Sequence, residues 1–247
     1  MRSPARPIVL AVVLAGIGAF TSYWSVVWLV RGSYVTVLIM LAVTVWGFGF
    51  AAFFTSTALG VGKSRIENGT SGTLLRPPRF VDTVTIAPVA AMTLACLLHL
   101  VFAPFGMVDY VTAGTMRAVP IACLFLVVFG LSTLYRMLKH RGGGHLRVDP
   151  SGYEVWNSHW NSLRRGTWDE IEDILDHKRK GRKSFNELIV FVPSRGPDAV
   201  LFADAITDNS YALREWVRFY WQHPECRNEL LDERALHRLD EQAFTTE

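Results

Sequence analysis

Four long hydrophobic segments dominate the N-terminal part of the chain. They cover about residues 8–30, 34–59, 86–105 and 118–136, and the only Asp, Glu, Lys or Arg among them is the terminal Arg136. The first segment alone would rise roughly 35 Å as a helix, which exceeds the roughly 30 Å hydrocarbon core of a bilayer. The pattern therefore predicts a bundle of four transmembrane helices, and the short break at Arg31–Ser33 makes the first two an antiparallel hairpin.

Basic residues are distributed unequally between the two ends of these helices. If the N-terminus is cytoplasmic, the outer loops contain only Arg31 and Arg117. Such a bias follows the positive-inside rule, so we expect both termini in the cytoplasm. The inner segments then contain nine basic residues: Arg2, Arg6, Lys63, Arg65, Arg76, Arg79, Arg136, Lys139 and Arg141.

The predicted spans offer little chemistry for moving ions or protons. Ion-coupled transporters place ionisable side chains inside the bundle, and His99 is the one candidate here, expected near the outer interface. Small residues such as Gly47 and Ala51, four positions apart, permit close helix contact and are expected to serve packing within the bundle. The helices therefore resemble an anchor more than a conduit.

The pattern changes to short extended segments after Gly142-Gly143-Gly144. His145–Asp149 and Gly152–Ser158 flank a Pro-Ser-Gly turn, which predicts a hairpin. Thr167 and Glu170 form a capping box for one helical turn at Trp168. Further strands are expected at Ser162–Trp168, after the turn at Trp168, at Asn186–Val192 and at Ala199–Ala203. An amphipathic helix capped by Asp208 or Asn209 should follow, and then a charged surface helix from Glu225 to about Leu239.

Charge supports a division of the chain at this point. Residues 1–141 contain 11 basic and 3 acidic residues, a net charge of +8, whereas the remainder contains 14 basic and 19 acidic residues, a net charge of −5. A contrast of this size marks a change of environment. We therefore predict a four-helix transmembrane domain over 1–141 and a small cytoplasmic α+β domain with a C-terminal helical extension over 142–247.

The second domain resembles a bacterial pleckstrin-homology-like domain fused to transmembrane helices. The resemblance covers roughly Gly144 to His223 and depends on serial strands, the Pro-Ser-Gly hairpin, the Trp168-Asp169-Glu170-Ile171 step and the closing helix with Trp216. It implies a β-barrel or sandwich with a C-terminal helix, in a protein of the bacterial cell (inner) membrane. Six strands are predicted here, where the family has seven.

A basic loop is the strongest candidate binding feature. Lys178, Arg179, Lys180, Arg182 and Lys183 lie between two predicted strands, with Gly181 at the tip. Cations held beside a bilayer can contact anionic lipid headgroups, at roughly 1 kcal/mol each. The alternative interpretation is a solvated turn that offsets the acidic residues at 169–176. Trp156, Trp160 and Trp168 are expected in the core, with a peptide-binding surface as the alternative.

Motifs for catalysis are lacking in the sequence. The histidines have no metal-ligand spacing, no glycine-rich phosphate loop is followed by Lys and Ser or Thr, and no nucleophile elbow occurs. We therefore expect no enzyme activity, no cofactor and no metal. Nucleic acid is not an expected partner because the domain is acidic outside the basic loop.

The favoured hypothesis is a membrane-anchored scaffold or regulatory protein without enzymatic activity. Its partners would be membrane lipids and an unidentified protein. The alternatives are a small transporter or channel component with a regulatory domain, and a membrane-bound enzyme acting on lipid. The sequence does not identify a pocket for either.

Overall fold

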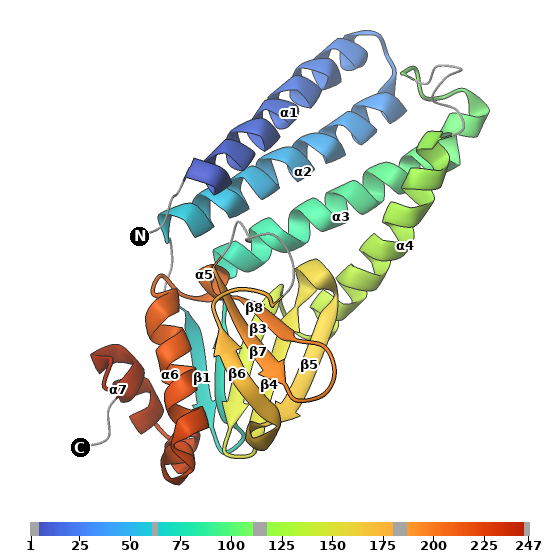
Figure 1. The fold of residues 1–247 in the computed structure, drawn as a ribbon. Helices are drawn as coiled ribbons and strands as arrows, with labels where there is room; N and C mark the ends of the chain where they lie inside the picture. Colours follow the sequence, from blue (N-terminus) through green and yellow to red (C-terminus); the bar gives the residue numbers. More distant parts are fainter. Residues whose placement is uncertain (1–4, 61–63, 111–117, 180–186, 245–247) are drawn as a thin grey trace. The chain divides into compact units, whose positions relative to one another are not determined.

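Two compact units make up the chain in the computed structural model, which describes residues 5–60, 64–110, 118–179 and 187–244 (Figure 1). The first unit comprises residues 1–55 and 83–139, and the second comprises 56–82 and 140–247. The chain therefore passes between the units three times. As a result, the second unit is built from two segments of the sequence, one before and one after residues 83–139.

Four helices form the first unit. They are α1 (Ala5–Val30), α2 (Tyr34–Leu59), α3 (Arg79–Phe102, continued by a 3-10 turn at Ala103–Phe105) and α4 (Ala118–Lys139). All four are long and apolar enough to cross a membrane, as predicted. α3 begins at Arg79, seven residues before its predicted start at Ile86, because its charged first turn was excluded from the apolar segment.

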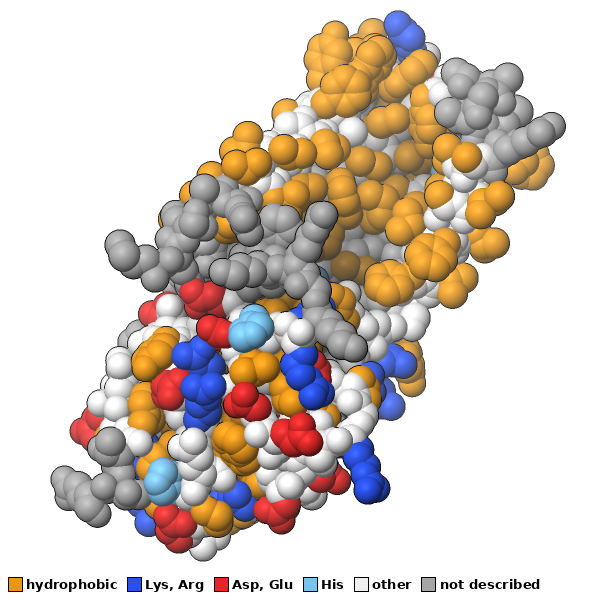
Figure 2. Space-filling model, in the orientation of Figure 1, with side chains coloured by type: hydrophobic (Ala, Val, Ile, Leu, Met, Phe, Trp, Pro, Cys, Tyr) orange, Lys and Arg blue, Asp and Glu red, His pale blue; other side chains and the backbone are white. Residues whose placement is uncertain are grey.

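The helices lie side by side in chain order (Figure 1), and small residues set their spacing. A Cβ atom on Gly47 in α2 would lie 2.9 Å from the Leu14 carbonyl oxygen in α1, and one on Gly49 would lie 2.3 Å from Pro88 Cγ in α3. Gly47 therefore serves internal packing, as expected. The visible outer side chains of the helices are almost all hydrophobic (Figure 2), and no more than 33% of each span is buried within the protein, as in a protein surrounded by lipid.

Two antiparallel sheets form the second unit. The larger has the order β1-β2-β3-β4-β5 and the smaller has the order β6-β7-β8. The larger sheet consists of β1 (Arg65–Gly69), β2 (Gly72–Arg76), β3 (Gly144–Asp149), β4 (Gly152–Asn157) and β5 (Ser162–Thr167). The smaller consists of β6 (Ile171–Leu175), β7 (Leu188–Pro193) and β8 (Ala199–Phe202). The predicted hairpin and the strands predicted after it are confirmed. Where their ends are described, they lie within two residues of the predicted ends.

The first two strands were not predicted. The segment between α2 and α3 was interpreted as a loop, but it forms the β1–β2 hairpin, and β2 pairs with β3 at Thr73↔Val148 and Leu75↔Leu146. Leu75 and Leu146 are both fully buried. The compact unit therefore includes strands far upstream of the predicted boundary at residue 142.

One hydrophobic core lies between the two sheets and the C-terminal helices. It combines residues of the larger sheet, such as Leu146 and Val155, with Ile189 and Phe191 of β7 and with Trp216. Trp216 lies on α6 (Ser210–Gln222), which follows the short α5 (Ala203–Ile206). This contiguous burial is the main source of stability expected for the unit.

The chain after α6 corrects a second prediction. The single surface helix expected from Glu225 to Leu239 is instead a 3-10 helix, η4 (Pro224–Leu231), followed by α7 (Arg234–Glu241). Leu230 and Ala235 are completely buried, and the Trp216 indole N–H donates to the Ala235 carbonyl at 2.8 Å. Buried apolar contacts and hydrogen bonds, such as that from the Thr73 hydroxyl to the Leu230 carbonyl at 2.8 Å, therefore hold this charged segment against the core.

Candidate ligand-binding hollow beside the basic loop

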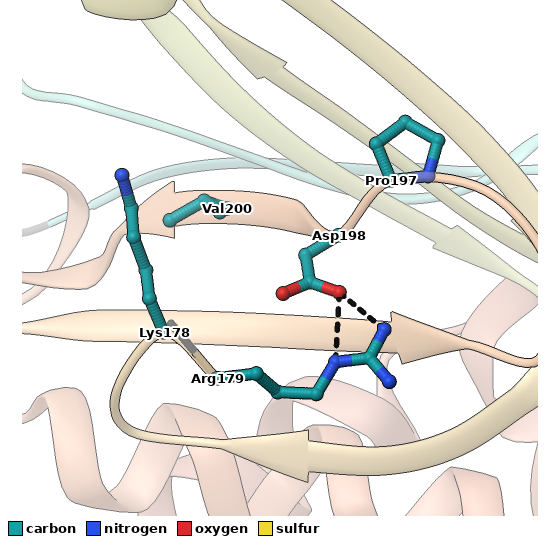
Figure 3. Close-up of a pocket in the computed structure, with 5 residues that line it drawn as sticks. All are labelled: Lys178, Arg179, Pro197, Asp198 and Val200. Carbon is teal, nitrogen blue, oxygen red and sulfur yellow. Dashed lines mark hydrogen bonds and ion pairs between the residues drawn. The ribbon is translucent and has the colours of Figure 1, made fainter. Parts of the chain in front are cut away.

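The basic loop follows β6 and precedes β7. Of its five candidate lipid contacts, Lys178 and Arg179 are described, whereas Lys180, Arg182 and Lys183 lie outside the described residues. Lys178 and Arg179 diverge from the end of β6 (Figure 3). Their surroundings therefore decide what this part of the loop can bind.

Arg179 is engaged by carboxylates of its own domain. Its Nε and Nη2 atoms donate to Asp198 Oδ1 at 3.2 and 2.7 Å, and Glu172 lies 3.9 Å from Nη1. Arg179 follows β6 and Asp198 precedes β8, so the pair joins the β6–β7 and β7–β8 connections, which begin at opposite ends of the antiparallel sheet. The Asp198 carboxylate offsets part of the Arg179 charge, while the guanidinium stays 44% exposed.

Lys178 makes a different contact. Its ammonium nitrogen lies 3.5 Å from the centroid of the Trp160 ring, which is a close cation–π geometry. Trp160 belongs to η2 (Ser158–Trp160), and 40% of its surface is exposed. The prediction that three tryptophans lie in the core is confirmed for Trp156 and Trp168, which are buried, and is wrong for Trp160.

A hollow of about 560 Å³ opens between these side chains. It is lined by Lys178, Arg179, Pro197, Asp198 and Val200 (Figure 3). The hollow thus combines an ammonium group, a neutralised ion pair and apolar carbon. The sequence offered Trp160 as part of a peptide-binding surface only as the alternative to a core position. Asp198 and Val200 were missed, because they become neighbours of the basic loop only when β6, β7 and β8 pair.

A buried apolar cluster adjoins the hollow through Val200, on the face of the smaller sheet opposite the main core. Leu188, Val190 and Val192 form a cluster separate from the main core, together with the partly buried Val200 and Phe202. The Phe202 ring also packs against Trp160, at 5.0 Å between centroids, and against His159, at 4.9 Å. Burial lowers the pKa of His159 to about 4, so this histidine adds no charge to the surface at neutral pH.

A second polar array lies on the outer face of the larger sheet. His145 Nε2 contacts Glu154 Oε1 at 2.7 Å, and Arg165 bonds to Glu154 Oε2. Burial lowers the pKa of His145. Burial raises the pKa of Glu154, but the hydrogen bonds from His145 and Arg165 outweigh it and lower that pKa overall. The array joins β3, β4 and β5, so it serves to hold the sheet together.

Within the described ranges, no three His, Cys, Asp or Glu side chains lie close enough together to hold a metal ion. The hollow at Lys178 is a candidate for ligand contact. Comparison of the chain with protein-family models, with curated proteins and with solved structures finds no match.

Proposed function

We propose that this protein is a membrane-anchored scaffold or regulator without enzymatic activity, whose α+β unit binds a protein partner at the Lys178 hollow. The observation that carries the proposal is the exposed Trp160 beside that hollow, with Lys178 over its ring. Tryptophan and arginine are enriched where proteins bind proteins, and a rigid aromatic surface provides contact area at low entropic cost.

The surroundings of the loop favour a protein over a lipid headgroup. Arg179 is paired with Asp198, and the Lys178 ammonium lies over the Trp160 ring. The Asp198 carboxylate in the hollow would also repel a phosphate. An extended protein segment can place apolar atoms on Val200 and Trp160.

The arrangement of strands supports a pleckstrin-homology-like unit. Strands β2–β5 and β6–β8 supply four and three strands to one core, and α6 follows with the buried Trp216. In such a unit β2, from between the transmembrane helices, would be the seventh strand that the family requires. β1 is an additional strand at the border of the larger sheet.

The location proposed for the α+β unit is the cytoplasmic face of a bacterial cell membrane. The excess of basic residues at the helix ends that lead into this unit supports it. Because the chain passes between the two units three times, the helices tether the unit at more than one point. Such a tether suits a protein that presents a binding surface at the membrane.

Photo-crosslinking in cells of the native host tests the proposal. We replace Trp160 with p-benzoylphenylalanine in the full-length protein, and use the same replacement of Tyr211 as a matched control. Tyr211 is also an exposed aromatic residue beneath a cation, Arg214. A discrete protein adduct from position 160 that is missing from position 211 is the expected result. Adducts only with phospholipid, or equal adducts from both positions, would refute the proposal.

A further inference from the structure

Two of the three cysteines meet inside the helical unit. Cys96 lies on α3 and Cys123 on α4, and only 4% and 8% of their surfaces are exposed. The two thiols share a hydrogen bond, so their sulfur atoms lie close together between the helices. Because the pair joins two different helices, the spacing of the cysteines along the chain does not reveal it.

The side chains around the two thiols are apolar or carry sulfur. Both cysteines belong to one buried cluster with Val127, and the partly buried side chains packed against that cluster are Met92, Leu100 and Val119. Met92 has a thioether and lies one helical turn before Cys96, on the same face of α3. No member of this cluster carries a carboxylate, an amide or an imidazole.

Sulfur ligands of this kind select Cu(I) over harder metal ions. Thiolate and thioether groups are the soft ligands that Cu(I) prefers, whereas Ca²⁺ and Mg²⁺ prefer oxygen. Structural zinc takes four ligands, and within the described residues no three His, Cys, Asp or Glu side chains gather for such a site. Cu(I), by contrast, is held by two thiolates on opposite sides of the ion.

We propose that Cys96 and Cys123 bind one Cu(I) ion between α3 and α4. Each thiol releases its proton to solvent, each sulfur then donates an electron pair to the ion, and the oxidation state of copper does not change. This site belongs to the helical unit and not to the α+β unit, so it is independent of the proposed protein-binding function.

Geometry favours a bridging ion over a disulfide bond. Two metal–thiolate bonds of roughly 2.3 Å in line hold the sulfurs roughly 4.6 Å apart. A disulfide instead brings the sulfurs to roughly 2.05 Å. The sulfurs of hydrogen-bonded thiols are nearer to the first spacing, so an ion can replace the shared proton with little movement of α3 or α4.

The thiol pair lies near one end of the helices. Cys96 is six residues before the end of α3, and Cys123 is five residues after the start of α4, so each is roughly 8–9 Å from its helix end. The Tyr110 phenol, which follows α3, interacts electrostatically with both thiols and contacts His99 Nδ1 at 2.8 Å. This polar pair offsets part of the negative charge that two thiolates and one Cu(I) ion carry together.

Titration with Cu(I) tests the inference. The full-length protein in lipid nanodiscs is titrated without oxygen against a competing chelator of Cu(I). The wild type and Cys226→Ser, which alters the partly buried cysteine of η4, should bind one ion per chain with equal affinity. Loss of a second-shell partner already weakens metal binding by roughly 10–100-fold, so Cys96→Ser or Cys123→Ser should weaken it by at least about 100-fold. Equal affinity in all three variants, or a loss only in Cys226→Ser, would overturn the proposal.

Two measurements on the wild type do not depend on how the variants fold. X-ray absorption of the copper-loaded protein should show sulfur as the nearest neighbour of the ion, and nitrogen or oxygen neighbours alone would place the ion elsewhere and refute the site. Alkylation of protein freshly isolated from membranes, followed by mass spectrometry, should find both thiols reduced. A disulfide between Cys96 and Cys123 would refute the site, because oxidised sulfurs cannot bind the ion as thiolates.

Discussion

Asp82, in the first turn of α3, connects three separate parts of the second unit. Its carboxylate pairs with the Arg65 guanidinium of β1 and accepts a hydrogen bond at 2.9 Å from the Gly143 N–H, in the link between α4 and β3. Only 12% of the Asp82 side chain is exposed. This residue therefore fixes the places where the chain enters and leaves the sheet.

Asp82→Ala would leave both donors without their acceptor. A lost hydrogen bond to a charged group costs roughly 1.5–3 kcal/mol, and an unsatisfied buried N–H costs roughly 1–3 kcal/mol. Arg65 remains partly solvated and keeps its bond to the Pro77 carbonyl, so the smaller values apply to each. We expect a loss of about 2.5 kcal/mol, which for a unit of this size lowers the melting temperature by about 5–10 °C.

The assay is thermal unfolding of the full-length protein in lipid nanodiscs, followed by tryptophan fluorescence. Asp82→Asn keeps an acceptor for Gly143 but loses the charge, so it should show about half the effect. Asp169→Ala, at an exposed position in η3 (Trp168–Glu170), is the matched control. A melting temperature for Asp82→Ala within about 1 °C of the wild-type value would refute this account of the junction.

Three further outcomes are expected. Because His159 has a lowered pKa of about 4 against an unfolded value near 6.5, stability should fall as pH drops from 6.5 to 4, by up to about 3 kcal/mol from this residue. His159→Phe should remove that part of the pH dependence in unfolding measured from pH 4 to 8. Trp216→Ala should cost about 3–5 kcal/mol in denaturant unfolding, against less than about 1 kcal/mol for the exposed Trp160→Ala. Gly49→Val should force α2 and α3 apart and broaden the elution peak of the detergent-solubilised protein in size-exclusion chromatography. Gly16→Val, at a position with open space around it, should leave the peak unchanged.

Local pattern was sufficient to predict the helices and the later strands. Long apolar segments have few alternatives to a transmembrane helix, and the capping box at Thr167 and Glu170 forms as expected. The N-cap of α6 is Asn209, one of the two predicted candidates, and its side chain accepts from the Ala212 N–H at 3.0 Å. In each case the determining residues lie within a few positions of one another.

Features that depend on distant pairing were not predictable in this way. β2 is stabilised by β3, which lies about 70 residues later, beyond two membrane helices. Neither strand of the β1–β2 hairpin is long or strongly apolar, so its local signal is weak. The hollow has the same origin, because Trp160, Lys178 and Asp198 meet only through the pairing of the smaller sheet and its packing near η2.

The pairing of β2 with β3 is the claim on which the whole arrangement depends. It can be measured by introducing Leu74→Cys and Arg147→Cys, which face each other across the two strands, into a full-length protein whose native cysteines are replaced by alanine. Mild oxidation in membranes should form a disulfide between these positions. It should not form one between Leu74→Cys and Glu154→Cys, one strand further away. Equal crosslinking of both pairs, or none of the first, would contradict a unit assembled from both sides of the helices.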